Sequence, residues 1–427
     1  MIQSQNNITT ASRALVLGTG LLMMPMSATP APAGPSCCGV PGESISGSPC
    51  AVSAGHAMRA NDRFFAATQT TNALSAVLAS VVAGLPGDQM ISAPHARDAS
   101  VNPLRFFGPK VIIANRNAGT VSVIDAKSDR VIGTFDLPPA ANTPEPMYVN
   151  YTNTNDAIWV GDRANDRMLV YQNNTGRLLA EIPTGSGVFH QWADPVGGQM
   201  WVVNDIDKSA TVIDVETFDV LATVPMPTDL SGDGERPHDV IIDADDSFAI
   251  VSILRADGAD FLVRFDTTTF EETGRVQVGD DPHLTWSRAS NLVYSPNQLT
   301  SNIYIFDPMD PGFVPMDIID DVPGAHGAGM SFDGNRLYVS NISGGGTDAL
   351  WFVDTDTSMV MGTPADTPVA TPHNIAVSPF GNKLWVTHSG ADATAVTVFE
   401  MTPGNPMPMF VTELETDLNP FGLALTP

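Results

Sequence analysis

Basic residues are scarce in this chain. Of its 427 residues, 20 are Lys or Arg and 47 are Asp or Glu, which gives a formal net charge of −27. A surface this acidic repels phosphate groups, so neither nucleic acid nor an anionic membrane surface is expected as a partner. The chain also lacks an apolar stretch long enough to cross a bilayer, and we therefore expect no membrane span.

Cysteine is rarer still. The three cysteines are Cys37, Cys38 and Cys50, and the motif Cys-x-x-Cys-His does not occur. This excludes c-type haem attached through that motif, and the lack of a Walker loop or dinucleotide fingerprint argues against a nucleotide cofactor. In an oxidising compartment Cys50 is expected to pair with one of the adjacent cysteines, which leaves one thiol for a bridge to another chain. A metal site that includes His56 is an open alternative.

The N-terminal quarter of the chain differs from the rest. Residues 1–33 have the features of an export signal peptide: Arg13, an apolar run over 14–26 and the cleavage pattern 31–33. We therefore predict a periplasmic or extracellular protein. Residues 34–109 are predicted to form an N-terminal extension, cysteine-bearing and partly helical, with one amphipathic helix within 61–84. This helix is expected to pack on the rest of the chain, or to mediate self-association or contact with a protein partner.

Glycine and proline are abundant by contrast, with 36 and 34 residues, and a short phrase containing histidine recurs among them. The phrase usually reads Pro-His, and its histidines follow one another at intervals of 43–48 residues: His190, His238, His283, His326 and His373. A fixed period of about 40–50 residues suits one four-stranded blade of a β-propeller. Short β-branched runs separated by Gly, Asp, Asn or Pro fill each interval, as strands in such a blade require.

The end of the chain sets the number of blades. Residues 419–425 form one more innermost strand with no strands after it, whereas the first blade begins at its second strand, 111–115. We therefore predict that the C-terminal strand completes the first blade and removes two open sheet edges. The predicted fold is all-β: a seven-bladed β-propeller over residues 110–427, closed by the C-terminal strand.

Two stretches carry a resemblance to a known family. Residues 337–341, Leu-Tyr-Val-Ser-Asn, and residues 372–381, Pro-His-Asn-Ile-Ala-Val-Ser-Pro-Phe-Gly, are similar to the YVTN-type β-propeller repeat. The resemblance implies the propeller fold over about residues 110–427. It does not imply an activity, because propellers support many.

The first residues of the innermost strands are candidate metal ligands. These strands line the central channel, so their first residues should form a ring at one mouth: Met147, His190, His238, His283, His326, His373 and Phe421. Imidazole and thioether ligands suit copper, and imidazole alone also suits zinc or iron. Three or four converging nitrogens are enough for such a site. We predict a metal site formed by the five histidines and Met147, with copper favoured.

A sixth histidine is expected near this ring. The second strands end on the same face of the propeller, one strand further out, at Asn115, Asp162, Asn204, Asn341 and His388. These side chains could accept the second N–H of the ring imidazoles and so orient them. His388 is added to the predicted ligands because Asn or Asp stands at the matching positions.

The ring is also similar to that of nitrous oxide reductase, a seven-bladed propeller whose channel histidines hold a copper cluster. The resemblance implies a redox or metal-handling role. The chain lacks that family's cysteine- and histidine-rich C-terminal domain, and two ring positions are Met and Phe, so reduction of nitrous oxide itself is not expected.

Two alternatives remain open, and the sequence does not decide whether the protein is an enzyme. The histidines could be structural features of a duplicated repeat in a non-enzymatic scaffold or surface interaction protein, or could sense pH as a cluster. The protein could also be a channel-mouth hydrolase of the lactonase kind. Such an enzyme needs carboxylates in the channel, and because the predicted ring supplies none, this function ranks last.

Overall fold

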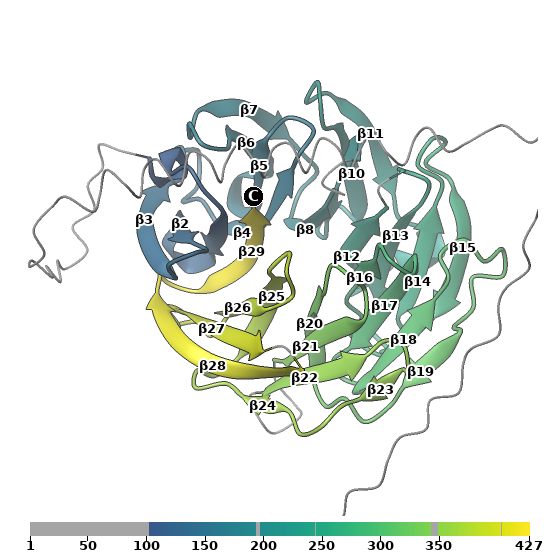
Figure 1. Cartoon of the computed structure of the whole chain (residues 1–427). Coiled ribbons are helices and arrows are strands. Elements are labelled where there is room, and N and C mark those ends of the chain that lie inside the picture. The colour runs from purple at the N-terminus through teal and green to yellow at the C-terminus, as the bar shows by residue number, and fades with distance from the viewer. Residues whose placement is uncertain (1–101, 194–196, 244, 343–348, 403) are drawn as a thin grey trace, which may run out of the picture. The chain divides into compact units, whose positions relative to one another are not determined.

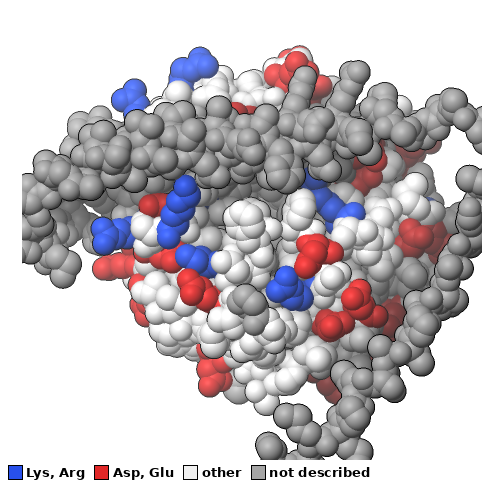
Figure 2. All heavy atoms as spheres, in the orientation of Figure 1, with Lys and Arg blue, Asp and Glu red and all other residues white. Residues whose placement is uncertain are grey.

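The computed structural model describes residues 102–427 except 194–196, 244, 343–348 and 403. The expected signal peptide, the three cysteines and the helix within 61–84 lie outside the described residues. Among the described residues, no helix has the length and apolarity that crossing a membrane requires. Among the residues that Figure 2 colours by charge, acidic side chains are interspersed with basic ones.

Seven antiparallel sheets form a ring of blades (Figure 1). Blade 1 consists of β29 (Pro420–Thr426), β1 (Lys110–Asn115), β2 (Thr120–Asp125) and β3 (Arg130–Asp136). Blade 2 consists of β4 (Pro146–Thr152), β5 (Ala157–Asp162), β6 (Arg167–Gln172) and β7 (Leu178–Pro183). Blade 3 consists of β8 (Val188–Trp192), β9 (Gln199–Asn204), β10 (Ser209–Asp214) and β11 (Val220–Pro225).

The remaining blades repeat this order from the channel outwards. Blade 4 consists of β12 (Arg236–Ile242), β13 (Ala249–Leu254), β14 (Phe261–Phe265) and β15 (Glu272–Gln277). Blade 5 consists of β16 (Thr285–Ser287), β17 (Leu292–Asn297), β18 (Asn302–Phe306) and β19 (Asp317–Ile319). Blade 6 consists of β20 (Ala325–Met330), β21 (Arg336–Asn341), β22 (Ala349–Asp354), β23 (Met359–Val360) and β24 (Ala365–Asp366). Blade 7 consists of β25 (Pro372–Val377), β26 (Lys383–His388), β27 (Ala395–Thr402) and β28 (Asn405–Glu415). The described helices are single 3-10 turns: η1 (Pro103–Arg105), η2 (Arg116–Ala118), η3 (Arg163–Asn165) and η4 (Thr228–Leu230).

The C-terminal strand closes the ring, as predicted. β29 pairs antiparallel with β1, with Ile112 opposite Ala424 and Lys110 opposite Thr426. This pairing joins the last strand of the chain to the first described one, so that neither is left as an open edge. The all-β, seven-bladed architecture is confirmed.

The hydrophobic core is divided into seven seams, each between two neighbouring blades. The second strands supply much of each seam; every residue of β1 and β5 is buried. A strand enclosed on both faces reads as a continuous apolar run rather than an alternating one, which is why these segments were recognisable in the sequence. Outermost strands such as β11 are largely exposed.

A β-bulge interrupts the innermost strand in six blades. In β4, β8, β12, β20, β25 and β29 the innermost strand has one residue more than its partner between successive pairs. A bulge changes the direction of side chains locally. Strict alternation would point every second side chain away from the channel. At the bulge, two successive side chains can point into the channel.

Candidate functional site

The register of the blades defines one layer of side chains across the channel. Pro146, Ala325 and Pro372 pair with the last residues of β5, β21 and β26. The residue after each of these prolines or alanine begins the bulge. In the other blades the corresponding pairs are Pro237–Ile253, one residue before the end of β13, Pro282–Asn297 and Pro420–Asn115. The residues that follow these six positions are six members of the layer: Met147, His238, His283, His326, His373 and Phe421.

Blade 3 departs from the prediction. Val188 pairs with Asn204, the last residue of β9, so Phe189 occupies the layer and His190 follows one residue later. The predicted ring of five equivalent histidines is therefore wrong by one register position in this blade. The layer contains a histidine arc (His238, His283, His326 and His373) and an apolar arc (Phe421, Met147 and Phe189).

Side chains in the layer touch around the channel. Ring centroids are 4.7 Å apart for His238–His283, 3.7 Å for His283–His326 and 4.7 Å for His326–His373. The histidine arc meets the apolar arc at His373–Phe421, 4.2 Å, and at Phe189–His238, 5.0 Å. Met147 and Phe421 form a small apolar cluster with Tyr148 and Phe189.

His190 lies in the next layer, beside residues that the sequence did not single out. Its ring is 3.9 Å from that of Tyr148, centroid to centroid. Its Nδ1–H donates to Asp239 Oδ1 at 2.8 Å, and the same carboxylate lies 3.7 Å from Nδ1 of His283 through Oδ2. The backbone N–H groups of Val240 and Leu284 also donate to this carboxylate, which fixes its position.

The expectation that the channel lacks carboxylates is therefore wrong. Asp239 directly follows His238, and Asp281 stands two residues before His283, with Oδ1 3.5 Å from His238 Nε2. Only the first residue of each innermost strand was counted in the sequence. The bulge in β12 brings the next residue to the channel as well, and a sequence read with period two gives no sign of this.

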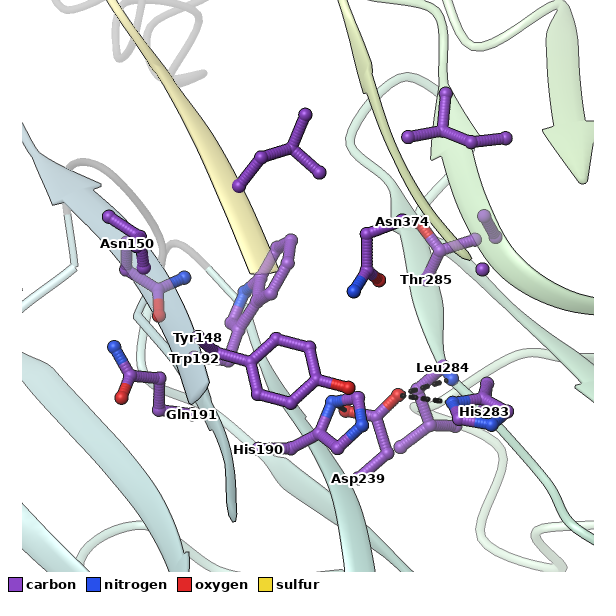
Figure 3. A pocket seen from close by; sticks show the side chains of 15 residues that line it. Tyr148, Asn150, His190, Gln191, Trp192, Asp239, His283, Leu284, Thr285 and Asn374 are labelled. Atoms are coloured by element: carbon purple, nitrogen blue, oxygen red, sulfur yellow. Dashed lines mark hydrogen bonds and ion pairs between the residues drawn. The ribbon is translucent and has the colours of Figure 1, made fainter. Parts of the chain in front are cut away.

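A pocket of about 100 Å³ adjoins this second layer (Figure 3). Its polar lining includes Tyr148, Asn150, His190, Gln191, Trp192, Asp239, His283, Thr285 and Asn374. Four buried polar atoms of these residues have no hydrogen-bond partner among the described residues: Asn150 Oδ1, His190 Nε2, Gln191 Oε1 and Trp192 Nε1. Buried polar atoms in proteins almost always have partners, so this concentration indicates a place for water or a polar ligand.

Burial favours the neutral form of four histidines of the channel. It lowers the pKa of His373 to about 3, and it lowers the pKa values of His238 and His326 well below that of a free imidazole. Burial also lowers the pKa of His190, although the charge and hydrogen bond of Asp239 oppose the change. For Asp239, burial alone would raise the pKa, but His190 and His283 more than offset it and the pKa falls below its ordinary value. At neutral pH the pair is a neutral imidazole donating to an ionised carboxylate.

Two predicted ligands have other surroundings. Met147 is fully buried in the apolar cluster. The nitrogens of His388 contact the carbonyl oxygen of Ala370 at 3.0 Å and Oγ1 of Thr397 at 2.8 Å. The other second-strand ends bond within their own neighbourhoods: Asn115 donates to Ser122, and Asp162 pairs with Arg167. Because these ends face the third strand, Asp239 takes the orienting role predicted for them.

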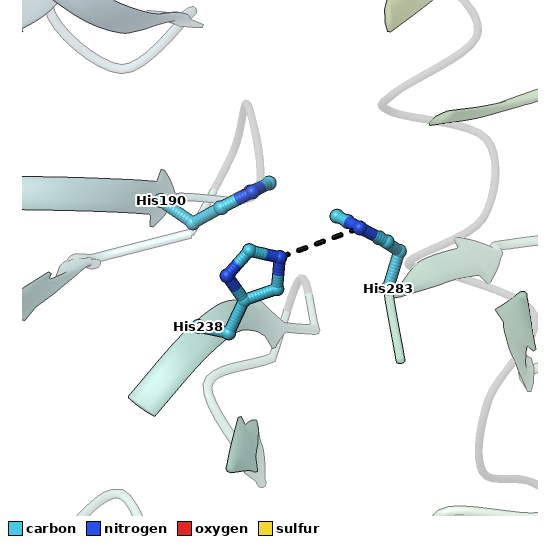
Figure 4. Close-up of side chains that lie close together, drawn as sticks. All are labelled: His190, His238 and His283. Carbon is cyan, nitrogen blue, oxygen red and sulfur yellow. Dashed lines mark hydrogen bonds between the residues drawn. The ribbon is translucent and has the colours of Figure 1, made fainter. Parts of the chain in front are cut away.

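Three of the predicted ligands converge. His190, His238 and His283 each offer a ligand nitrogen within 4.8 Å of the others (Figure 4). A second group with the same spacing consists of Asp281, His283 and His326. His373 shares the layer, but its Nδ1 lies 2.8 Å from Nδ2 of Asn374 and 3.3 Å from the carbonyl oxygen of Phe421.

Part of the chain matches the model of a known protein family. Residues 108–310 match the model of a lactonase family described as a seven-bladed β-propeller. This range contains His190, Asp239 and His283. No curated protein matches the chain. The YVTN-type and nitrous oxide reductase resemblances stay predictions.

Solved structures with the same fold have low sequence identity to the chain. A protein from Lactobacillus plantarum is 17% identical, with a TM-score of 0.61 over 75% of this chain and 100% of that one. A putative 6-phosphogluconolactonase from Bacteroides fragilis is 16% identical, with a TM-score of 0.59 over 78% of this chain and 100% of that one. Another from Bacteroides uniformis is 18% identical, with a TM-score of 0.59 over 74% and 99%. At these identities the likeness establishes the fold alone.

Proposed function

We propose that the channel pocket hydrolyses a small, uncharged lactone, with His190 as the general base. The observation that carries the proposal is the state of the His190 ring. Asp239 accepts the hydrogen bond from Nδ1, which leaves the lone pair on Nε2, and Nε2 has no partner among the described residues. A base that is neutral, oriented and free at the wall of a pocket is what water activation requires. The match of residues 108–310 to a lactonase family supports the reaction class.

The pocket lining indicates the substrate class. The cavity is smaller than the roughly 300–1,000 Å³ of most ligand sites, which favours a small molecule. Its lining residues include no Lys or Arg, and Asp239 contributes a negative charge. A phosphorylated sugar lactone would therefore lack a cationic partner here. A hydroxyl group of an uncharged lactone could donate to Asn150 Oδ1, and its carbonyl could accept from Trp192 Nε1.

The proposed reaction balances with water alone. The water oxygen attacks the lactone carbonyl carbon while its proton passes to His190 Nε2, and Asp239 stabilises the imidazolium that forms. The ring C–O bond then breaks, and the leaving oxygen takes the proton back from Nε2. The product is the open hydroxy acid, and the His190–Asp239 pair returns to its starting state.

The test is hydrolysis of a panel of γ- and δ-lactones by the full chain, followed by acid release at constant pH. His190→Gln should lower kcat by roughly 10²–10⁴, the usual contribution of a general base. His388→Asn is the matched control, because Asn occupies the same strand end at Asn204 and Asn341; it should keep the wild-type rate. Wild-type protein inactive on every lactone, or a His190→Gln variant as fast as wild type, would overturn the proposal.

The other functions considered from the sequence stay predictions. A redox or metal-handling role, with copper favoured, gains the converging ligand atoms of His190, His238 and His283, but ligand atoms alone do not imply electron transfer. A scaffold role would leave the unpartnered polar atoms of the pocket without a purpose.

A further inference from the structure

The atoms that converge beside the pocket include an acid as well as imidazoles. Nε2 of His238 and Nε2 of His283 are 3.3 Å apart. Oδ1 of Asp281 lies 3.5 Å from the first and 3.9 Å from the second. We infer that His190, His238, His283 and Asp281 bind one divalent transition-metal ion. This inference does not rest on the proposed hydrolysis.

The spacing suits tetrahedral coordination. With metal–nitrogen bonds of about 2.0–2.1 Å, two nitrogens 3.3 Å apart subtend an angle of roughly 104–111° at the metal. The carboxylate oxygen already lies near the edge length that such a tetrahedron requires. The third nitrogen, from His190, lies within 4.8 Å of the ligand nitrogens of His238 and His283 and must move inwards to complete the set.

Asp239 contacts two of the proposed imidazole ligands at their Nδ1 atoms. Metal-binding imidazoles usually donate their second N–H to a carboxylate, which fixes the ring and strengthens the ligand nitrogen. The Asp239 carboxylate accepts from Nδ1 of His190 at 2.8 Å, which leaves Nε2 of this ring as the ligand atom, and Nδ1 of His283 lies 3.7 Å from the same carboxylate. Asp239 thereby orients one of the three proposed imidazole ligands and lies close to a second.

The surroundings favour binding of a cation. The three imidazoles are buried, so little water competes for their nitrogens. Packed nitrogen lone pairs with few donors nearby are costly unless a cation or a proton lies between them. The side chain of Asp281 is 21% exposed, and its backbone N–H donates to the carboxylate of Asp260. The partly exposed carboxylate of Asp281 gives a cation a negatively charged way in.

The donor set selects the class of metal. Three imidazole nitrogens and one carboxylate oxygen suit Zn²⁺ or Cu²⁺, whereas Ca²⁺ and Mg²⁺ prefer oxygen ligands alone. The thioether of Met147, which would favour Cu⁺, is packed in the apolar cluster. Zn²⁺ and Cu²⁺ are therefore the probes to use.

The experiment uses the full chain with its cysteines alkylated, because Cys37, Cys38 and Cys50 are themselves potential ligands. Protein stripped with a chelator is titrated with Zn²⁺, and metal retained after gel filtration is measured by elemental analysis. We expect one equivalent in the wild type. A parallel Cu²⁺ sample should give an electron paramagnetic resonance spectrum with splitting from three nitrogens.

Variants then assign the ligands. His238→Gln and Asp281→Asn should each weaken binding at least tenfold, and Asp239→Asn should weaken it by about 10–100-fold through the loss of orientation. His388→Asn is the control and should bind as the wild type does. If His238→Gln does not fold, the partly exposed Asp281→Asn carries the assignment. Less than one-fifth of an equivalent in the wild type, or unchanged affinity in His238→Gln and Asp281→Asn, would overturn the inference. Both proposals use the lone pair on Nε2 of His190, so a bound metal ion should inhibit the lactone hydrolysis; hydrolysis is therefore measured on the same stripped protein, which keeps the two proposals separate.

Discussion

The two arcs of the channel layer occupy the same backbone position and have different chemistry. In blades 4 to 7 this position holds histidine, and the four rings meet at centroid distances of 3.7–4.7 Å. In blades 1 to 3 it holds Phe421, Met147 and Phe189, which pack with Tyr148 as an apolar cluster. The repeat therefore fixes where a side chain lies but not what it does there.

The difference between the arcs explains the state of the histidines. An apolar arc beside the imidazoles excludes water, and burial is the largest cause of the lowered pKa values of His238, His326 and His373. The second layer then joins the two sides of the channel. His190 comes from blade 3, behind the apolar arc, and meets Asp239 from blade 4, behind the histidine arc. The candidate chemistry lies at the boundary between the arcs.

The strongest test of this boundary is Asp239→Asn. The amide keeps the size of the side chain but removes the charge that holds the His190 tautomer, so lactone hydrolysis should fall by roughly 10²–10⁴. The measurement is kcat at saturating lactone. Asp243→Asn is the matched control: Asp243 is a buried acid of the same blade that bonds Ser247, and its loss should leave kcat unchanged. If Asp239→Asn keeps the wild-type kcat, Asp239 does not take part in lactone hydrolysis.

Extending the histidine arc should cost stability. Phe421→His places a fifth imidazole in the layer, against His373 and within the apolar cluster. Lost apolar volume and a buried polar ring without a ready partner should lower the free energy of unfolding by about 2–4 kcal/mol. Urea unfolding measures this. Phe380→His, at a ring 89% exposed, is the control and should change stability by less than about 0.5 kcal/mol. Equal effects at both sites would contradict the distinction between the arcs.

The histidine arc also predicts how stability depends on pH. The pKa of His373 is about 3 in the folded chain and about 6.5 when unfolded, so the unfolded chain binds the proton first as pH falls. The contribution of His373 to stability should be constant above about pH 7 and decline between about pH 6.5 and 3. His373 alone should remove about 1 kcal/mol between pH 6 and 5. His373→Phe, which copies the residue of blade 1, should make the decline shallower in urea unfolding at these two pH values; an unchanged slope would contradict burial as its cause.

The sequence predicted the fold well because its signals are redundant. Apolar second strands, turns and the unpaired strand at 419–425 all indicated seven blades and closure by the C-terminus, and each blade repeats the same information. The candidate site was predicted less well because it depends on single residues. Counting from Phe189 or His190 changes an interval by one residue, which is within the scatter of 43–48 residues between the histidines. Spacing therefore could not place His190 in the second layer.

Asp239 shows the other limit. Asp239 directly follows the predicted ligand His238 in the sequence Pro237-His238-Asp239. It was not predicted as a site residue because strict alternation along a strand would point its side chain away from the channel. Only the bulge in β12 brings both residues to the axis, and no residue type in that phrase requires a bulge. Asp281, by contrast, lies in the loop before β16, and strand periodicity makes no prediction about the side-chain directions of loop residues.

The smallest expected effect is at Met147, and it decides whether the apolar arc takes part in metal binding. The side chain is fully buried among Tyr148, Phe189 and Phe421. Met147→Leu conserves volume and should change the free energy of unfolding by less than about 1.5 kcal/mol, with Zn²⁺ and Cu²⁺ affinity unchanged. Met147→Ala leaves a cavity and should cost about 2–5 kcal/mol, which shows that the assay detects this position. A tenfold loss of Cu²⁺ affinity in Met147→Leu would make the thioether a ligand, and the arcs would then share one site instead of meeting at its edge.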